Sequence, residues 1–493
     1  MEVLTIRKID ETFLQIECEQ STERELSEHF CFYVPGYKFM PAYRNRMWDG
    51  KIRLFDMRQK TLYCGLYNYL EEFCEERGYT IVNDGPIFHE YNDELLNETL
   101  KKTLLPTNIN PRDYQLNALT HALRSSKSLL LSPTASGKSL IIYLACRYFI
   151  EEDPSEKILI IVPTTSLVEQ MYTDFGEYSK NDKWFNHDEW IDRIHGGHKQ
   201  GPLMHRIVIS TWQSIYKKPK EWFNNFGMVI GDEAHQFKAK SLTSIMEKTS
   251  NAKYRIGTTG TLDGTQTHQL VLEGLFGPVH KVTTTKALMD SDQLAKLDVK
   301  VLLLKYKDEY CQVVSKLKYQ QELDFIVSYA PRNNFISNLA LDQKGNTLIL
   351  FNYVDKHGKP LHDLLSKKIG KKRKLFYVSG ETAVDDRENI RSITEGQDDA
   401  IIVASLGTFS TGINIKRLHN IIFASPSKSQ IRVLQSIGRG LRISGDDINT
   451  TVYDIADDLH WKNKRNYTLN HAGERIKIYS KEKFKYKIHE IEI

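Results

Sequence analysis

The chain has 493 residues, of which 40% are hydrophobic and 26% charged, and its formal net charge is only +4. This is the composition of an ordinary globular protein with room for about three domains, and so small a net charge does not by itself indicate a nucleic-acid partner. Cysteines at no metal-ligand spacing, a start unlike a signal peptide and the shortness of every apolar run favour a reduced, cytoplasmic protein that spans no membrane.

Residues 1–86 are rich in aromatic and charged side chains and contain no phosphate loop, which predicts a separate small α+β domain. The stretch Phe30–Phe55 interleaves rings with basic residues, so that it can contact duplex phosphates while some rings stack. The alternative is a half-buried hairpin whose rings form a core and whose basic side chains are its solvated face. The candidate nucleic-acid contacts are Lys38, Arg44, Arg46, Lys51 and Arg53.

Residues 87–106 are the predicted linker, with a helix over Asp93–Lys102 and a break at Leu105–Thr107. From residue 107 to 283, short apolar runs alternate with longer segments of helical periodicity. Such runs, each followed by a polar or glycine-containing turn, are typical of strands in a parallel sheet covered on both faces. The expected strands include residues 129–131, 158–162, 207–209, 228–230 and 254–256.

A candidate phosphate loop follows the first of these strands, and a helix is expected to begin at Lys138. A glycine-containing turn between a strand and a helix aims backbone N–H groups at phosphate oxygens, and the helix N-terminus adds partial positive charge. Lys138 contributes a point charge, and Ser139 a hydroxyl that can ligate Mg²⁺. The loop residues are Ser132, Pro133, Thr134, Ala135, Ser136, Gly137, Lys138 and Ser139.

An acidic element, Asp232-Glu-Ala-His235, follows the apolar strand at residues 228–230. Asp232 can hold Mg²⁺ through its water shell, and Glu233 can accept a proton from an attacking water. The alternative for a bare Asp–Glu pair is a solvated strand end. Upstream, Arg112 and Gln115 are candidates for recognising adenine, because a carboxamide carries a donor and an acceptor; the alternative is a helix cap.

A second α/β domain is expected over residues 284–460, with a helix-rich connection around Tyr306–Ala340 that leads into its sheet. Its apolar runs predict another sheet, with strands at residues 347–351, 375–378, 401–404, 421–424 and 452–455. Residues 461–493 form a basic tail, with Arg475 among its cations, that we expect to pack on the second domain. The predicted fold is therefore α/β, with two parallel-sheet lobes behind a small α+β domain.

The second domain carries Gln435-Ser-Ile-Gly-Arg-Gly-Leu-Arg442. Arg439 and Arg442 lie three residues apart on an expected helix, so both guanidinium groups point the same way. Such a pair can stabilise charge on a transferred phosphoryl group. Two surface arginines in a salt-bridged helix are the alternative.

Three sets of turn residues are candidates for holding a nucleic-acid strand. Each follows a predicted strand or begins a turn, where hydroxyl and backbone N–H groups can hold phosphates without reading sequence. Plain turn chemistry is the alternative. The residues are Pro163, Thr164 and Thr165, then Thr211 and Trp212, and finally Gly407 and Thr408.

In order and spacing, these motifs resemble those of superfamily 2 helicases with a DEAH-type acidic motif. The matching segments are residues 112–115, 132–139, 162–170, 209–214, 232–235, 257–261, 379–382, 404–414 and 435–442. The resemblance covers about residues 107–460 and implies two RecA-like P-loop lobes with ATP between them. Two departures are Ser132, which replaces the first glycine of the loop, and Thr259-Gly-Thr261, where many members carry Ser-Ala-Thr.

The resemblance implies a role for each motif. The implied catalytic set, which binds phosphate, activates water and senses the γ-phosphate, is Lys138, Asp232, Glu233, Gln435, Arg439 and Arg442, with Ser139 and Asp232 as ligands of Mg²⁺. His235, Thr259 and Thr261 would couple hydrolysis to the nucleic-acid face. Gly412 and Asn414 would lie beside the nucleotide, between it and the bound strand.

The whole chain, including its N-terminal domain, is similar to recombination and repair helicases of T-even bacteriophages. This resemblance implies an ATP- and Mg²⁺-dependent DNA helicase of 3′-to-5′ polarity that remodels branched nucleic acids by branch migration, fork regression and unwinding of R-loops and D-loops. The implied partners are single-stranded, forked and four-way DNA, RNA–DNA hybrids, and single-strand-binding and recombination proteins. The resemblance also implies a monomer in the host cytoplasm.

Three alternatives remain open at this point. The first is a double-stranded DNA translocase that separates no strands, and the second is an RNA helicase. The third is a non-enzymatic, nucleotide-gated clamp on branched DNA, against which the complete catalytic set argues.

Overall fold

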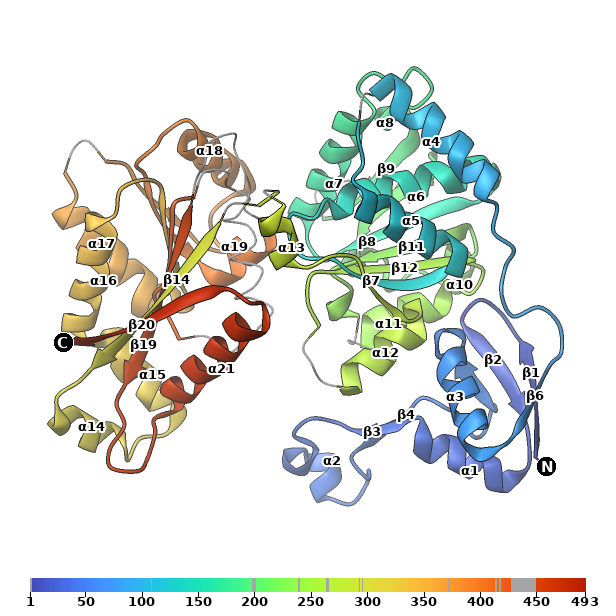
Figure 1. Cartoon of the computed structure of the whole chain (residues 1–493), viewed down its shortest axis with the longest axis horizontal. Helices are drawn as coiled ribbons and strands as arrows, with labels where there is room; N and C mark the ends of the chain where they lie inside the picture. Colours follow the sequence, from blue (N-terminus) through green and yellow to red (C-terminus); the bar gives the residue numbers. More distant parts are fainter. Residues whose placement is uncertain are drawn as a thin grey trace. The chain divides into compact units, whose positions relative to one another are not determined.

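The structure, a computed structural model, describes residues 2–107, 109–196, 201–237, 240–262, 266–291, 293–294, 296–370, 373–412, 415, 418–426 and 449–493. The chain divides into two compact units, Met1–Ser132 with Gly137–Val282 and Pro133–Ser136 with Thr283–Ile493. The first unit holds a small N-terminal domain and a seven-stranded sheet, and the second holds another seven-stranded sheet (Figure 1). Among the residues that the structure describes, no helix combines the length and the hydropathy that a bilayer crossing requires.

The N-terminal domain contains β1 (Val3–Lys8), β2 (Phe13–Glu17), α1 (Gln20–His29), β5 (Thr61–Tyr63), η2 (Cys64–Leu66), α3 (Tyr67–Arg77) and β6 (Thr80–Asn83). Its four-stranded sheet has the order β5-β2-β1-β6, in which only the β1–β6 pair is parallel. Alternation along the strands buries Leu4, Ile6, Leu14 and Ile16 against α1 and α3. This is the α+β domain that the sequence predicts.

A hairpin extends from this domain and carries a short helical tip. The hairpin strands are β3 (Cys31–Tyr33) and β4 (Lys51–Arg53), and the tip contains η1 (Tyr37–Phe39) and α2 (Pro41–Arg44). We refer to residues 33–50 as the tip. Its stretch of sequence is the one in which aromatic and basic residues alternate.

The N-terminal domain is joined to the first lobe around a buried arginine. Arg255 is 1% exposed and donates to three carbonyl oxygens of its own lobe and, from Nη1, to Thr12 Oγ1 at 3.2 Å. Beside it, the Glu11 carboxylate lies 2.7 Å from the Lys127 ammonium. Burial raises the pKa of Glu11, but hydrogen bonds and charge from His89 and Lys127 outweigh that effect and hold its pKa at about 2. The stability that this ionised carboxylate contributes is therefore kept above its usual pKa of 4.5 and lost as the pH falls towards 2.

Helix α4 (Asp93–Thr107) connects the N-terminal domain to the first lobe. The expected break at Leu105–Thr107 is wrong, because the helix continues through Pro106 to Thr107. Leu96, Leu100 and Leu104 pack on the core of the first lobe, and this packing keeps the last turn helical in spite of the proline.

The first lobe is a parallel sheet of order β13-β7-β12-β11-β8-β10-β9. Its strands are β7 (Lys127–Leu131), β8 (Lys157–Val162), β9 (Ile191–Ile194), β10 (Ile207–Thr211), β11 (Phe226–Asp232), β12 (Tyr254–Thr259) and β13 (Val279–Lys281). Its helices are α5 (Asp113–Ser125), α6 (Lys138–Glu152), α7 (Thr165–Tyr178), α8 (His187–Trp190), α9 (Trp212–Ile215), α10 (Lys220–Phe223), η3 (Ala234–Gln236), α11 (Lys240–Lys248) and α12 (Gln266–Phe276). Successive residues of β8 enter two different cores, Ile158 and Ile160 under α5–α7 and Leu159 and Ile161 under α11 and α12. The sheet is thus covered on both faces, as predicted.

The second lobe is a parallel sheet of order β16-β17-β15-β18-β19-β14-β20. Its strands are β14 (Leu297–Lys305), β15 (Thr347–Phe351), β16 (Leu375–Val378), β17 (Ile401–Ser405), β18 (Asn420–Phe423), β19 (Thr450–Asp458) and β20 (Lys485–Glu492). Its helices are α13 (Thr285–Asp290), α14 (Asp308–Val314), α15 (Tyr319–Ser328), α16 (Ala330–Asp342), η4 (Val354–Gly358), α17 (Lys359–Lys368), α18 (Val384–Glu395), α19 (Leu406–Gly412) and α21 (Tyr467–Lys481). The C-terminal residues are more than a tail, because β20 pairs with β14 and extends the sheet.

Two buried ion pairs anchor this lobe. Arg332 and Asp457 are both fully buried, with Nε 2.7 Å from Oδ1. Arg475, which the sequence places in a basic tail, is only 2% exposed and lies 2.8 Å from Asp454 Oδ1, which fixes α21 on the sheet. Each pair makes further hydrogen bonds, to Tyr306 and Ala424 O in the first case and to Tyr479 in the second. Removing one partner of either pair would leave an uncompensated buried charge.

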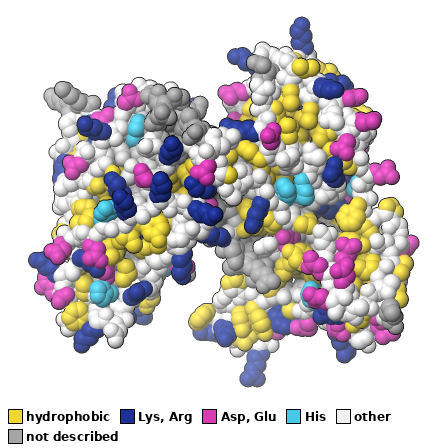
Figure 2. Space-filling model, in the orientation of Figure 1, with side chains coloured by type: hydrophobic (Ala, Val, Ile, Leu, Met, Phe, Trp, Pro, Cys, Tyr) yellow, Lys and Arg dark blue, Asp and Glu magenta, His cyan; other side chains and the backbone are white. Residues whose placement is uncertain are grey.

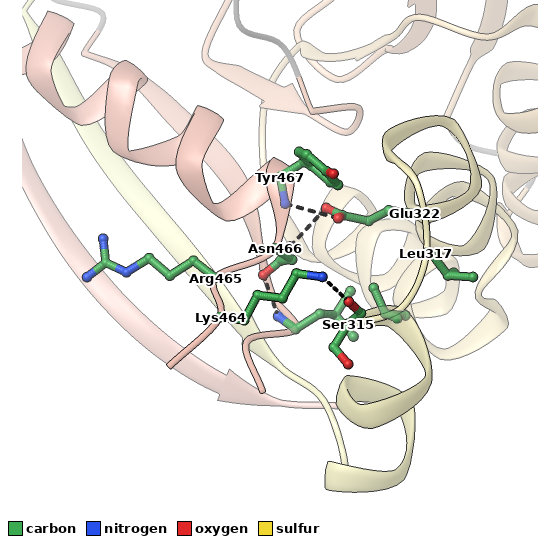
Figure 3. Close-up of a pocket in the computed structure, with 9 residues that line it drawn as sticks. Ser315, Leu317, Glu322, Lys464, Arg465, Asn466 and Tyr467 are labelled. Carbon is green, nitrogen blue, oxygen red and sulfur yellow. Dashed lines mark hydrogen bonds between the residues drawn. The ribbon is translucent and has the colours of Figure 1, made fainter. Parts of the chain in front are cut away.

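The N-terminus of α21 is held by one buried carboxylate (Figure 3). Glu322 accepts hydrogen bonds from Asn466 Nδ2 at 3.1 Å, Tyr467 N at 3.0 Å and both the backbone N–H and the hydroxyl of Thr468 at 2.8 and 2.9 Å. Nearby, Lys464 Nζ donates to Ser315 O. The pocket beside these residues has a volume of about 10 Å³, the room of one water molecule, and is too small for a nucleotide.

We predict that Glu322→Ala lowers the free energy of unfolding of the second lobe by about 2 kcal/mol, because four donors at the start of α21 lose their acceptor. Denaturant unfolding and hydrogen exchange of the α21 amides measure the effect. Glu474→Ala on the same helix removes an exposed pair with Lys477 and should change little. Equal effects of the two variants would contradict the assignment.

Candidate nucleotide site and nucleic-acid surface

The predicted nucleotide-binding motifs meet at the carboxyl ends of three adjacent strands. The phosphate loop follows β7, Asp232 ends β11 and Thr259 ends β12, which lies between the other two. The register pairs Thr259 with Leu131 and Asp232 with Thr258. Ligand sites of parallel α/β sheets form at such strand ends, because the loops there have no further strand to cover them.

The phosphate loop is shaped by two residues in the left-handed region, Ala135 with φ 66° and Gly137 with φ 78°. Inside the loop, Ser136 Oγ donates to Pro133 O at 2.7 Å. Lys138 Nζ donates to Ser132 O at 3.2 Å, so the ammonium folds back over the loop that it is predicted to assist. The remaining loop residue of the prediction, Thr134, is half-buried.

Gln115 packs directly against this loop. Its Oε1 accepts from the backbone N–H of Arg112 at 2.9 Å, which caps α5, while a Cβ added to Gly137 would stand 2.2 Å from its Nε2. Arg112 Nη1 donates to Tyr114 OH at 2.9 Å. The helix-capping alternative is therefore present in the structure, and it also brings the carboxamide to the loop; recognition of adenine stays a prediction.

Asp232 is a buried carboxylate, and its Oδ1 accepts from Thr258 Oγ1 at 2.7 Å. Burial and the neighbouring Glu233 charge raise the pKa of Asp232, while the Lys138 ammonium acts in the opposite direction. A second carboxylate beside a buried one favours a bound cation. The hydroxyl of Ser139 and the carboxylate of Asp232 are the hard oxygen ligands that Mg²⁺ prefers, so the donor set fits this ion.

Glu233 adopts a strained backbone conformation, with φ 52°. Left-handed backbone in a residue with a Cβ is uncommon and costs about 1–3 kcal/mol, and such residues cluster at functional sites. The turn moves the chain off the end of β11, and η3 begins at once with Ala234.

The three predicted coupling residues form a short chain of hydrogen bonds. Thr259 Oγ1 donates to Thr261 O at 3.0 Å and therefore accepts from His235 Nδ1 at 3.1 Å. The same ring nitrogen lies 3.3 Å from Glu233 Oε2. Thr259 O also accepts from the backbone N–H of Ser132 at 2.8 Å. Within the first lobe, the catalytic base candidate is thus joined through β12 to Ser132, the first residue of the phosphate loop.

The candidate strand contacts of the first lobe lie in loops after adjacent strands β8 and β10. The Thr164 hydroxyl accepts from Leu167 N and caps α7, which Thr165 begins. The Thr211 hydroxyl lies 2.9 Å from Ser214 Oγ just before Trp212 opens α9, and Pro163 O accepts from Gln213 Nε2 at 3.5 Å. These are contacts of ordinary turn chemistry, and phosphate binding there stays a prediction.

In the second lobe, Gln435, Arg439, Arg442 and Asn414 lie outside the described residues, so their roles remain predictions. Gly412 is the last residue of α19. Gly407 is exposed at the start of that helix, and the Thr408 hydroxyl accepts from Ser405 Oγ at 2.7 Å.

The tip holds a cluster of three tyrosine rings beside a glycine turn. Tyr37 lies 4.6 Å from the Tyr33 ring and 4.7 Å from the Tyr43 ring. Gly50 has φ 84°, and a Cβ there would stand 2.3 Å from the Tyr37 ring, so only glycine fits. These rings pack on one another, as the hairpin alternative predicts in part, but Tyr33 is 51% exposed. Phe39 and Met47 are 78% and 75% exposed.

The five basic candidates of the hairpin separate into two groups. Lys51 and Arg53, on β4, are neutralised by Glu28, and Arg53 also by Asp49 at 2.8 Å. The tip residues Lys38, Arg44 and Arg46 are exposed, and no ion pair joins them to an acid in the described part of the chain.

The surface of the tip combines charge with apolar side chains. Figure 2 shows basic and hydrophobic side chains next to each other over the tip. An open hollow of about 590 Å³ lies beside Arg44 and Arg46. Uncompensated positive charge next to exposed apolar surface suits a nucleic acid.

Sequence reasoning missed two residues that the structure brings to the nucleotide site. Thr258, which donates a hydrogen bond to Asp232, lies inside residues 257–261, a segment of the family resemblance. The motif could therefore have indicated it. Tyr178, whose hydroxyl lies 2.9 Å from Ser139 Oγ, lies in no motif and ends a helix that begins far from the loop. No sequence signal identifies it.

Comparison with known protein families finds one match in the N-terminal domain and one in each lobe. Residues 4–84 match the family described as DNA helicase UvsW, N-terminal, residues 108–264 match Type III restriction enzyme, res subunit, and residues 331–444 match Helicase conserved C-terminal domain. The ATP-dependent DNA helicase uvsW of Enterobacteria phage T4 is 37% identical over 498 residues, with 97% of each chain covered. The DNA 3′-5′ translocase XPB2 of Sulfurisphaera tokodaii is 24% identical and covers 71% of this chain and 82% of its own.

Two solved structures place these matches in three dimensions. The crystal structure of T4 UvsW covers 99% of both chains at 34% identity, with a TM-score of 0.52. A fragment of a putative HsdR subunit of a type I restriction enzyme from Vibrio vulnificus covers 86% of this chain and 74% of its own, at 17% identity and a TM-score of 0.56. The second likeness shows the fold alone.

We predict that Gly137→Ala lowers nucleotide affinity at least tenfold, because the new Cβ would meet the Gln115 carboxamide and the backbone is left-handed. Titration with a fluorescent ATP analogue measures the change. Gly473→Ala, in α21, meets open space and should leave affinity unaltered while stabilising its helix. Normal affinity in the Gly137 variant would show that the loop is not the nucleotide site.

Proposed function

This chain belongs to the UvsW family of ATP-dependent DNA helicases, and we propose that it uses ATP hydrolysis to remodel branched DNA. The observation that carries the proposal is the position of the tip. Its uncompensated cations belong to the same compact unit as Lys138 and Asp232, and buried polar contacts around Arg255 join the two parts. A motor with a second contact at a constant position can hold one arm of a junction while it acts on another.

The energetics of junctions support this substrate. Each base-pair step of duplex DNA contributes about 1.4 kcal/mol of stacking, which a helicase must overcome for every pair it opens. Branch migration and fork regression form one pair for each pair they break, so their net cost per step is close to zero. A motor of this size therefore has enough free energy from ATP for such reactions on four-way and forked DNA, and on R-loops, without a separate clamp.

For the chemical step, we propose that Lys138 and the loop hold the phosphates and that Glu233 accepts the proton of the attacking water. Ser139 and Asp232 would hold Mg²⁺, which would offset charge on the phosphate oxygens. Arg439 and Arg442 would stabilise the charge that develops during transfer, by analogy with the family motif. Thr259 and His235 would couple changes at Glu233 to the rest of the lobe through their hydrogen bonds. Movement along the strand would run 3′ to 5′.

A double-stranded DNA translocase is the second candidate, because residues 108–264 match a restriction-enzyme family. Strand displacement on forked, R-loop and four-way substrates separates the two functions. Release of strands or completed branch migration supports the helicase, whereas ATP turnover and translocation without any product supports the translocase. ATPase stimulation by RNA as strong as that by DNA would instead indicate an RNA helicase.

We predict that Glu233→Gln reduces ATP turnover and branch migration by about 10²- to 10⁴-fold while leaving ATP binding nearly unchanged, because the amide cannot accept the proton. Stopped-time ATPase, junction gels and nucleotide titration on the same preparation measure the three quantities. If the variant remained fully active in branch migration, a nucleotide-gated clamp would be the better description.

We also predict that replacing Lys38, Arg44 and Arg46 by Gln weakens binding to four-way junctions and reduces the dependence of log affinity on log salt by about 1 for each DNA phosphate that is no longer neutralised. The paired Lys51 and Arg53 provide the control, since their replacement by Gln should alter this slope much less. Point variants are preferable to deletion of residues 1–86, which would remove the partners of Arg255 and Lys127. An unchanged slope in the triple variant would refute the tip assignment.

A further inference from the structure

The hydroxyl of Ser139 has a neighbour that none of the nucleotide-binding motifs contains. Ser139 is the second residue of α6, and its Oγ lies 2.9 Å from the hydroxyl of Tyr178, the last residue of α7. Both residues are half-buried and belong to the same compact unit. The contact joins the proposed cation ligand to a helix that starts at the candidate strand contact Thr164.

Packing between α6 and α7 fixes the position of this phenol. Tyr143 lies one helical turn after Ser139 on the same face of α6, and its ring centroid is 5.5 Å from that of Tyr178 and 5.2 Å from that of Phe175. One further turn along, Arg147 donates to the Tyr143 hydroxyl at 2.8 Å and pairs with Asp182 at 2.6 Å. The end of α7 is therefore held against α6 by a buried aromatic and ionic cluster.

The chemistry of a hydroxyl ligand explains why such a neighbour is useful. A serine hydroxyl has one proton and two lone pairs, and it binds a cation through a lone pair. Its proton must then point away from the cation and needs an acceptor. A phenol oxygen can accept that proton, whereas a carboxylate neighbour such as Asp232 is itself needed as a ligand. Partners behind the ligands commonly tune metal affinity by 10- to 100-fold.

We propose that Tyr178 is a positioning residue for Ser139, accepting its hydroxyl proton so that a lone pair of Ser139 Oγ is directed to the Mg²⁺ that accompanies the nucleotide. The proposal rests on the assignment of Ser139 as a ligand in the proposed function. Tyr178 itself contacts neither nucleotide nor cation. Its effect is on how much Mg²⁺ the site requires, and not on how tightly the phosphates bind without the ion.

The test is Tyr178→Phe, which keeps the ring packed on Tyr143 and removes the hydroxyl that faces Ser139. We expect the affinity for a fluorescent ATP analogue in EDTA to be unchanged, and the Mg²⁺ concentration that half-saturates the tightening of nucleotide binding to rise about tenfold. The same shift should appear in the Mg²⁺ dependence of the ATPase, with kcat at saturating Mg²⁺ close to that of the parent. Tyr178→His, which retains a ring acceptor, should bring the Mg²⁺ requirement part of the way back to that of the parent.

Tyr172→Phe is the matched control, since it removes a hydroxyl of the same helix that bonds to Asp188 instead. It should leave the Mg²⁺ requirement unchanged. A Mg²⁺ requirement in Tyr178→Phe that equals or falls below that of the parent would overturn the proposal, and a fall would identify the contact as a latch that competes with the ion. Nucleotide binding is measured without DNA, so this result is independent of whether the protein remodels branched substrates.

Discussion

Burial of both faces of each parallel sheet is the constraint on which the candidate site depends. With helices on both sides, the first sheet offers its side chains to a ligand only at the strand ends, and the parallel direction puts every carboxyl end at one edge. The phosphate loop, Asp232 and Thr259 meet there although they are far apart in the chain. The burial that stabilises the lobe also disfavours the bare charge of the Asp232 carboxylate, so that a bound cation is favoured beside it.

The second organising feature is the polar seam between the N-terminal domain and the first lobe. Arg255 donates a hydrogen bond to Thr12, and Lys127 pairs with Glu11, so each of these two cations of the lobe has a partner in the N-terminal domain. Such seams are specific rather than strongly stabilising, because desolvation offsets much of the ionic attraction. Their effect here is to keep the tip in one unit with Lys138 and Asp232, a condition under which two contacts on DNA can act together.

Hydrophobic periodicity was sufficient to predict the α/β class and most central strands, and two expected strands of the second lobe, residues 347–351 and 375–378, have the bounds that the structure shows. It missed β14 and β20, where charged residues interrupt the apolar pattern, as at Lys300 or Lys487. The sequence places Arg475 among the cations of a basic tail, but it does not reveal that Arg475 is buried against Asp454. Tyr178 reaches Ser139 only through the packing of two helices, which no local pattern encodes.

The seam also has a consequence for how the polypeptide matures. Leu270 and Val271 of α12 pack on the core of the N-terminal domain, and the Tyr63 hydroxyl bonds to Glu247, 184 residues further along. A nascent chain therefore exposes an unfinished apolar face on its first domain until much of the following lobe has left the ribosome. Chaperone demand and sensitivity to proteases during translation should be greatest in that interval, and should end when α12 emerges.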